Sequence, residues 1–146
     1  MSERDIVNAL NKFIGTSGIS FRLKQSRFSE QFIDILVHSR KFGHYGIEHK
    51  SMKNSKNKSL YFSSSFSVDK HGVHQVERIS DFITRGGLKG YLIVEMKNGR
   101  GKDKTWFAIP WTRVERLYNK GRKSISHKLF NKKYQITLEK IGRILK

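Results

Sequence analysis

The amino-acid sequence predicts an α/β protein with a single compact domain, in which helices flank a central mixed β-sheet. Its 146 residues suit one domain that is large enough to bury a core. Apolar residues at helical spacing alternate along the chain with short runs of consecutive apolar residues, which are typical of strands. The resulting order is one helix, three strands, a second helix, two strands and a third helix. That order is typical of a domain whose sheet mixes parallel and antiparallel strands.

The first half of the chain predicts a helix followed by three strands. Apolar residues from position 6 to Ile14 recur every three to four residues, and Gly15 and Gly18 end that helix. A polar and basic stretch at 24–31 is expected to be a loop. The expected elements are a helix over 6–14, strands over 19–23, 32–37 and 45–50, an extended piece over 60–62 and a polar connection over 63–65.

The second half predicts a helix, a hairpin and a last helix. The expected elements are a helix over 73–84 ended by Gly86 and Gly87, strands over 90–96 and 105–110, a helix from Pro110 through Leu117 and an extended piece over 134–136. Three aromatic residues, Trp106, Phe107 and Trp111, are expected in the core or at a subunit interface. No repeat or linker divides residues 1–146, and the basic part from about 119 to 146 is expected to be the least ordered.

Positive charge dominates the composition. Thirty Lys and Arg residues face twelve Asp and Glu, which gives a formal net charge of +18. A polyanion is the natural partner of such a chain, and nucleic acid is the commonest polyanion. The excess is concentrated in two tracts, residues 40–58 and 113–146. The alternatives are a basic surface that only keeps the protein soluble, and an anionic membrane, for which we find no amphipathic helix with a broad apolar face.

Several classes of protein are disfavoured by what the sequence lacks. It has no apolar run near the ~20 residues needed to cross a bilayer, so no membrane partner is expected. Its first residues lack the layout of a signal peptide, and without cysteine it can form neither a disulfide nor a thiolate zinc site. We therefore expect a soluble protein of the cytoplasm, either nucleoid-associated or, if its source is viral, in the host cytoplasm.

Two carboxylates in otherwise apolar strands indicate chemistry. Asp34 interrupts the run at 32–37, and Glu48 lies in the run at 45–50, two residues before Lys50. Antiparallel pairing can bring Asp34 and Glu48 to one end of the sheet, and Glu48 and Lys50 project from the same strand face. Two close carboxylates repel each other unless a cation lies between them, and oxygen ligands suit Mg²⁺ or Mn²⁺. Lys50 could then orient or deprotonate an attacking water, which predicts phosphodiester hydrolysis.

Taken alone, this spacing is weak, because a lysine-rich chain can produce it by chance. The plain alternative is an exposed ion pair between Glu48 and Lys50. The apolar flanks of both strands, the helices before and after them and the positive charge favour the catalytic interpretation.

The ordered set of motifs resembles a known family. The segments "SERDIVNALNKF", "FIDILV", "IEHK", "HQVERISDFITRGG", "KGYLIVEM", "WFAIPWTRVERL" and "GRKSI" are similar to the archaeal Holliday-junction-cleaving enzymes (Hjc) and the bacterial RecU resolvases. Both groups are members of the PD-(D/E)xK nuclease superfamily. The resemblance covers residues 3 to about 125, and it implies the restriction-endonuclease-like nuclease fold. The superfamily's proline is replaced here by Ile33 before Asp34, and the inserted stalk of RecU is absent.

The resemblance also implies roles for individual residues. Asp34 and Glu48 match metal ligands, Lys50 matches the catalytic lysine, and Gln75 matches a recurrent glutamine of the following helix. Glu3 matches a metal-site glutamate of the opening helix. Family members keep a serine-bearing segment where this chain has the loop at 24–31, so Ser29 or Ser26 is expected near the cleaved strand. The implied cofactor is Mg²⁺ or Mn²⁺, with two ions per active site and no small-molecule cofactor.

The leading expectation is a homodimeric, metal-dependent endodeoxyribonuclease that resolves four-way (Holliday) junctions in recombination or repair. Paired incisions need two active sites, which a two-fold dimer supplies. Two alternatives stay open. The first is a PD-(D/E)xK nuclease of the restriction or repair type that acts on other DNA. The second is a nucleic-acid-binding protein without enzyme activity, in which Asp34 and Glu48 only pair with lysines.

Overall fold

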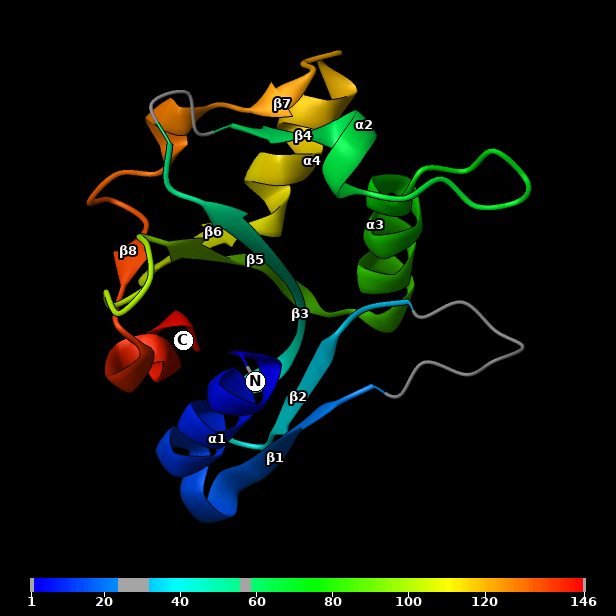
Figure 1. Cartoon of the computed structure of the whole chain (residues 1–146). Helices are drawn as coiled ribbons and strands as arrows, with labels where there is room; N and C mark the ends of the chain where they lie inside the picture. The colour runs from blue at the N-terminus through cyan, green and yellow to red at the C-terminus, as the bar shows by residue number, and fades with distance from the viewer. Residues whose placement is uncertain (1, 24–31, 56–58, 146) are drawn as a thin grey trace.

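A six-stranded mixed sheet forms the centre of the molecule (Figure 1). The structure is a computed structural model, and it describes residues 2–23, 32–55 and 59–145. The strand order is β1 (Gly18–Arg22), β2 (Ile35–Ser39), β3 (Gly43–Lys53), β5 (Lys89–Lys97), β6 (Thr105–Pro110) and β8 (Gln135–Ile136). The pair β3–β5 is parallel and the neighbouring pairs are antiparallel, so the predicted mixed sheet is confirmed.

Helices cover the two faces of this sheet and divide the core into two clusters. Helix α1 (Ser2–Ile14) and the 3₁₀ helix η3 (Leu138–Ile144) pack on one face, where Ile6, Leu10 and Ile141 are fully buried. Helices α3 (Gln75–Gly86) and α4 (Trp111–Asn119) pack on the other face, around Val76 and Val114. Within the described residues, no helix combines the length and the apolar character that crossing a bilayer requires.

Short elements complete the fold. Strands β4 (Leu60–Tyr61) and β7 (Ser124–Ile125) form a separate two-stranded sheet above the main one in Figure 1. The remaining elements are α2 (Phe62–Ser65), η1 (Gly15–Ser17) and η2 (His127–Leu129). The aromatic residues Trp106, Phe107 and Trp111 are buried in the core, as expected. The basic C-terminal part contributes β7, β8 and η3.

The boundaries of three elements differ from those predicted. Strand β2 begins at Ile35, after Asp34, because Ile33 is buried against the helices and Phe32 stacks on Phe82 at 5.3 Å. Apolar residues that pack in this way need no strand partner. Strand β3 runs on to Lys53, because it pairs with β5 along its whole second half. The prediction of a polar connection at 63–65 is wrong, since these serines lie in α2.

Two helix ends differ by small shifts. The helix predicted over 73–84 begins at Gln75, because the His74 side chain accepts a hydrogen bond from Val76 N and caps the helix. Gly87 ends it in a left-handed conformation with φ of 64°, which glycine adopts without strain. Pro110 is the residue before α4, and it closes β6 instead of lying in the first helical turn.

Candidate active site

The hairpin register places Asp34 opposite Glu48. Strand β2 pairs with β3 so that Ile35 lies opposite Ile47, and the next step of this register brings Asp34 beside Glu48. The Asp34 side chain is held there, because its Oδ2 accepts a hydrogen bond of 2.8 Å from His49 N. Glu48 is 2% exposed. A carboxylate just before β2 and a carboxylate in the middle of β3 therefore meet.

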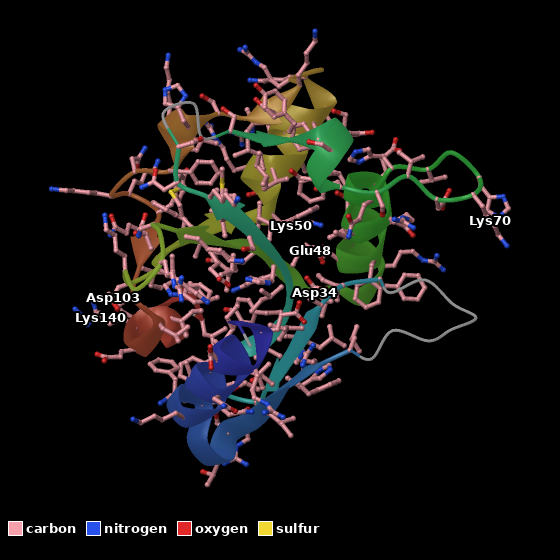
Figure 2. The ribbon with its side chains drawn as sticks, in the orientation of Figure 1. Asp34, Glu48, Lys50, Lys70, Asp103 and Lys140 are labelled. Atoms are coloured by element: carbon pink, nitrogen blue, oxygen red, sulfur yellow. The ribbon has the colours of Figure 1, made fainter. Side chains whose placement is uncertain are left out.

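Lys50 projects from the same face of β3 as Glu48. Its Nζ lies 3.4 Å from Glu48 Oε2 and 4.7 Å from the centre of the Phe66 ring. The side chain is 20% exposed, so the ammonium group reaches solvent beside the two carboxylates. Figure 2 shows Asp34, Glu48 and Lys50 following one another along the sheet, on the side that faces α3. The structure thus brings these three predicted residues together.

Gln75 joins the same group from α3. Its Nε2 donates to Glu48 Oε2 at 2.9 Å, and its Oε1 accepts from Lys50 Nζ at 3.4 Å. The amide is oriented by a third contact, since Oε1 also accepts from Ser67 N at 3.1 Å. Gln75 is the first residue of α3, so the cap on His74 fixes its position. One amide therefore holds both the buried carboxylate and the lysine.

Burial and charge act together on Glu48. Desolvation raises the pKa of Glu48 from its ordinary value of 4.5 to about 8, and the charge of Asp34 and a hydrogen bond with Asp34 also act to raise it. Lys50 opposes this effect, since its charge and its hydrogen bond lower the Glu48 pKa, but burial outweighs them. Glu48 therefore carries a proton near neutral pH when no cation is bound.

This arrangement fits a divalent cation of the magnesium type. Mg²⁺ is bound in proteins by one or two carboxylates together with water and substrate phosphate. A cation between Asp34 and Glu48 would replace the Glu48 proton and offset both the burial and the Asp34 charge that raise the Glu48 pKa. In the described part of the chain, no group of three or more His, Cys, Asp or Glu side chains could hold a metal. Asp34 and Glu48 are the carboxylates that could hold such a cation, and their role as metal ligands stays a prediction.

Glu3 lies apart from this pair. Its Oε1 accepts from Arg22 Nε at 3.2 Å, and its Oε2 lies 3.7 Å from His49 Nδ1. The His49 side chain projects from the opposite face of β3 to Glu48, where its Nε2 meets Glu95 Oε2 at 3.2 Å. The contacts of Glu3 are thus on the α1 side of the sheet, and its role as a metal ligand stays a prediction. Ser29 and Ser26 lie outside the described residues, so their expected role also stays a prediction.

Sequence reasoning missed four residues that support the site. Phe66 covers Lys50, Ser67 N orients Gln75, His74 caps α3 and His49 N holds Asp34. Phe66 and Ser67 lie in the connection between α2 and α3, which has no periodic pattern to predict where it packs. The capping residue could have been found, because Glu77 follows His74 by three residues and completes a capping box.

Comparison with known proteins supports the fold. No family model and no curated protein matches the sequence. Among solved structures, the chain is similar to Hjc from Archaeoglobus fulgidus, a Holliday junction resolvase from an archaeal hyperthermophile, with a TM-score of 0.59. The alignment covers 99% of this chain and 98% of that chain, at 18% sequence identity. This chain has the Hjc fold. The fold implied by the sequence resemblance is therefore confirmed.

Proposed function

We propose that this protein is a metal-dependent endodeoxyribonuclease that resolves four-way DNA junctions by paired phosphodiester hydrolysis. The observation that carries the proposal is the pairing of Asp34 with Glu48, with Lys50 on the same strand face, in a chain with the Hjc fold. Neighbouring strands hold two oxygen donors and one amine around a single point, as phosphodiester hydrolysis requires. The solved neighbour is described as a Holliday junction resolvase, which supports junction DNA as the substrate.

In this proposal Asp34 and Glu48 would hold Mg²⁺ or Mn²⁺, with two ions per active site. Glu3, the further ligand that the resemblance implies, would have to leave Arg22 and His49 to reach them. When bound, the cation neutralises charge on the phosphate and makes water more acidic. Lys50 lies beside the carboxylates, and we assign it the role of accepting a proton from the attacking water. One bond forms between that water oxygen and phosphorus, the bond from phosphorus to one deoxyribose oxygen breaks, and that oxygen takes a proton from solvent and leaves as a hydroxyl group.

Gln75 and Ser29 have supporting roles. Gln75 binds Glu48 and Lys50 simultaneously, so it keeps the amine within reach of the carboxylate pair before substrate arrives. Ser29 is proposed to contact the cleaved strand. Junction resolution needs two symmetric incisions, and we propose that a homodimer supplies the second active site. A DNA-processing role also places the protein, in this proposal, in the cytoplasm, where nucleoid or viral DNA is found.

A competition assay tests the substrate. The protein is incubated with Mg²⁺ and a labelled four-way junction in the presence of excess unlabelled linear duplex, and the reciprocal experiment labels the duplex. We expect nicks in the junction strands that persist under duplex competition, while the labelled duplex stays intact. Cleavage of both DNAs at equal rates would indicate a nuclease of the restriction or repair type. Binding without cleavage in either Mg²⁺ or Mn²⁺ would contradict the proposal.

A further inference from the structure

A second candidate site, lined by cationic side chains, lies at the carboxyl end of β3 and β5. The carboxyl ends of the parallel strands β3 and β5 and the turn that follows β5 line an open cavity of about 640 Å³. Five of its lining residues are cations, namely Lys53, Lys97, Arg100, Lys102 and Lys104. Every ionisable side chain among these lining residues is positively charged. Like charges that surround one cavity repel each other unless an anion enters it.

Hydrogen bonds fix the wall of this cavity. The Asn98 amide donates to Asp103 O at 2.7 Å and to Thr105 Oγ1 at 2.8 Å. Its Oδ1 accepts from Asn54 Nδ2 at 2.8 Å, which ties the turn to the end of β3. The backbone of Asn54 also donates to Lys97 O at 2.8 Å. The lysines therefore extend from a rigid support, which lowers the entropic cost of binding.

This cavity is on the opposite side of the sheet from the candidate active site. Lys53 is an odd number of residues from Lys50, so its side chain leaves β3 on the other face, the one that also carries Glu95. The Lys104 side chain lies on the same face as Glu95, because its Nζ is 2.8 Å from Glu95 Oε1. Along β3, Lys53 lies roughly 10 Å from Lys50. In Figure 2, Asp103 of the same turn lies well away from Glu48 and Lys50.

A straight duplex that lies against Asp34 and Glu48 on one face of the sheet would have to bend sharply around the end of the sheet to contact the cavity on the other face, and duplex DNA is stiff. Its persistence length is about 150 base pairs, and a sharp bend within a few base pairs costs several kcal/mol or more. A branched DNA meets no such cost, because a second arm leaves the branch point in another direction. The positive lining selects the backbone phosphates of that arm and not its bases.

We propose that this cavity binds backbone phosphates of a second duplex arm while the first arm lies at Asp34 and Glu48. The inference rests on the proposed function, since it assumes branched DNA as the substrate. The cavity would then contribute to the selection of junctions over linear duplex, because only a branched molecule can contact both faces of the sheet.

The test compares salt dependence of binding on two DNAs in metal-free buffer. The probes are a four-way junction and a linear duplex with the length of one arm pair. The variants are Lys97→Gln, Lys102→Gln and the double variant, and the matched control is Lys12→Gln, an exposed lysine in the last turn of α1. Each lysine that contacts a phosphate contributes about one unit to the slope of log K against log salt. The double variant should therefore flatten the junction slope by about two units for each bound protomer and leave the duplex slope unchanged.

The other outcomes would overturn the inference. Unchanged slopes on both DNAs would show that the cavity holds no phosphate, and equal losses on both would show that it contacts the same duplex as the active site. An effect of Lys12→Gln as large as that of either single variant would indicate nonspecific charge. Thermal unfolding checks that the variants fold. The assay measures binding in the absence of metal, so its result does not depend on whether the protein cleaves DNA. Failure of the proposed cleavage activity is therefore distinguished from failure of this inference.

Discussion

Lys50 is the residue whose chemistry the site constrains most tightly. Its amine contacts both Glu48 Oε2 and Gln75 Oε1 at 3.4 Å, and the Phe66 ring lies against it. These contacts direct the amine toward the point where Asp34 and Glu48 meet. If Lys50 only neutralises phosphate charge, any permanent positive charge at this position is sufficient. If Lys50 transfers a proton, the position needs an amine that can lose its proton.

Substitution of Lys50 separates these two roles. We predict that Lys50→Ala lowers the single-turnover rate of junction cleavage by about 10²–10⁴-fold, the usual range for a positioned proton-transfer group. Lys50→Arg should stay as slow as Lys50→Ala, because guanidinium keeps the charge but does not release a proton. Quenched-flow cleavage assays at saturating enzyme measure both rates. Substantial recovery of the cleavage rate in Lys50→Arg would contradict proton transfer by Lys50. Wild-type rates in both variants would show that the spacing of Glu48 and Lys50 is a coincidence.

The proton on Glu48 gives the metal-free protein a distinct pH dependence. Burial raises the Glu48 pKa above its value of 4.5 in the unfolded chain, to about 8. The stability that this proton contributes is therefore fully present below about pH 4.5 and is lost as pH rises through about 8. Glu48→Gln removes the titrating group and keeps an acceptor for Gln75.

We predict that wild-type protein in EDTA loses unfolding free energy relative to Glu48→Gln between about pH 4.5 and about pH 8, the range set by the raised pKa. Urea unfolding of both proteins at several pH values measures this difference, in which the titration of all other groups largely cancels. Mg²⁺ should reduce the difference at the upper end of this range, since a cation replaces the proton. Parallel pH profiles for the two proteins would contradict the raised Glu48 pKa.

At the scale of elements, the N-terminus of α3 positions the site. His74 Nδ1 accepts from Val76 N at 3.1 Å, and its Nε2 donates to Phe62 O at 2.8 Å, so one ring caps α3 and ties it to α2. Gln75 follows immediately and depends on this anchor. The helix end thus links the fold of the α2–α3 connection to the carboxylate pair.

Replacement of the cap tests this link. We predict that His74→Ala lowers the unfolding free energy by about 1–2 kcal/mol, through loss of the cap, and slows cleavage as Gln75 loses its fixed position. His74→Asn should recover much of the stability, because asparagine is a strong N-cap residue. Thermal unfolding and single-turnover cleavage measure the two effects. Equal stability of His74→Ala and wild type would contradict this role for the cap.

The sequence predicted which segments form helices and strands better than it predicted what those helices and strands contact. The apolar runs predicted the hairpin, and its two carboxylates predicted the meeting of Asp34 and Glu48. The start of β2 was misplaced, because Phe32 and Ile33 are apolar for helix packing and not for strand pairing. The cavity at the ends of β3 and β5 could not be predicted, since it depends on the parallel register of these two strands. Gln75 was predicted only through the family resemblance.

At the scale of the whole molecule, positive charge governs association. A net charge of +18 implies that DNA binding releases many counterions. We predict a steep salt dependence of binding. If the protein contacts about six to ten phosphates, an increase from 50 to 200 mM salt should lower its affinity by on the order of 10³–10⁵-fold. Fluorescence anisotropy with a labelled junction in EDTA measures it. A flat titration would contradict a nucleic-acid partner altogether.

The central claim is that Asp34 and Glu48 form the metal site at which DNA is cleaved. The most direct measurement is the time course of cleavage of a labelled four-way junction, in Mg²⁺ and in EDTA, by wild type, Asp34→Asn and Glu48→Gln. The matched control is Asp81→Asn, which alters an exposed carboxylate that pairs with Arg85 on α3.

We predict cleavage by wild type and Asp81→Asn in Mg²⁺ alone, and none by Asp34→Asn or Glu48→Gln. All four proteins should bind the junction with similar affinity in EDTA, because no phosphate contact is removed and the side-chain oxygen in Asp34→Asn can still accept the His49 N–H. Cleavage by Asp34→Asn at the wild-type rate, or cleavage by wild type in EDTA, would contradict the account.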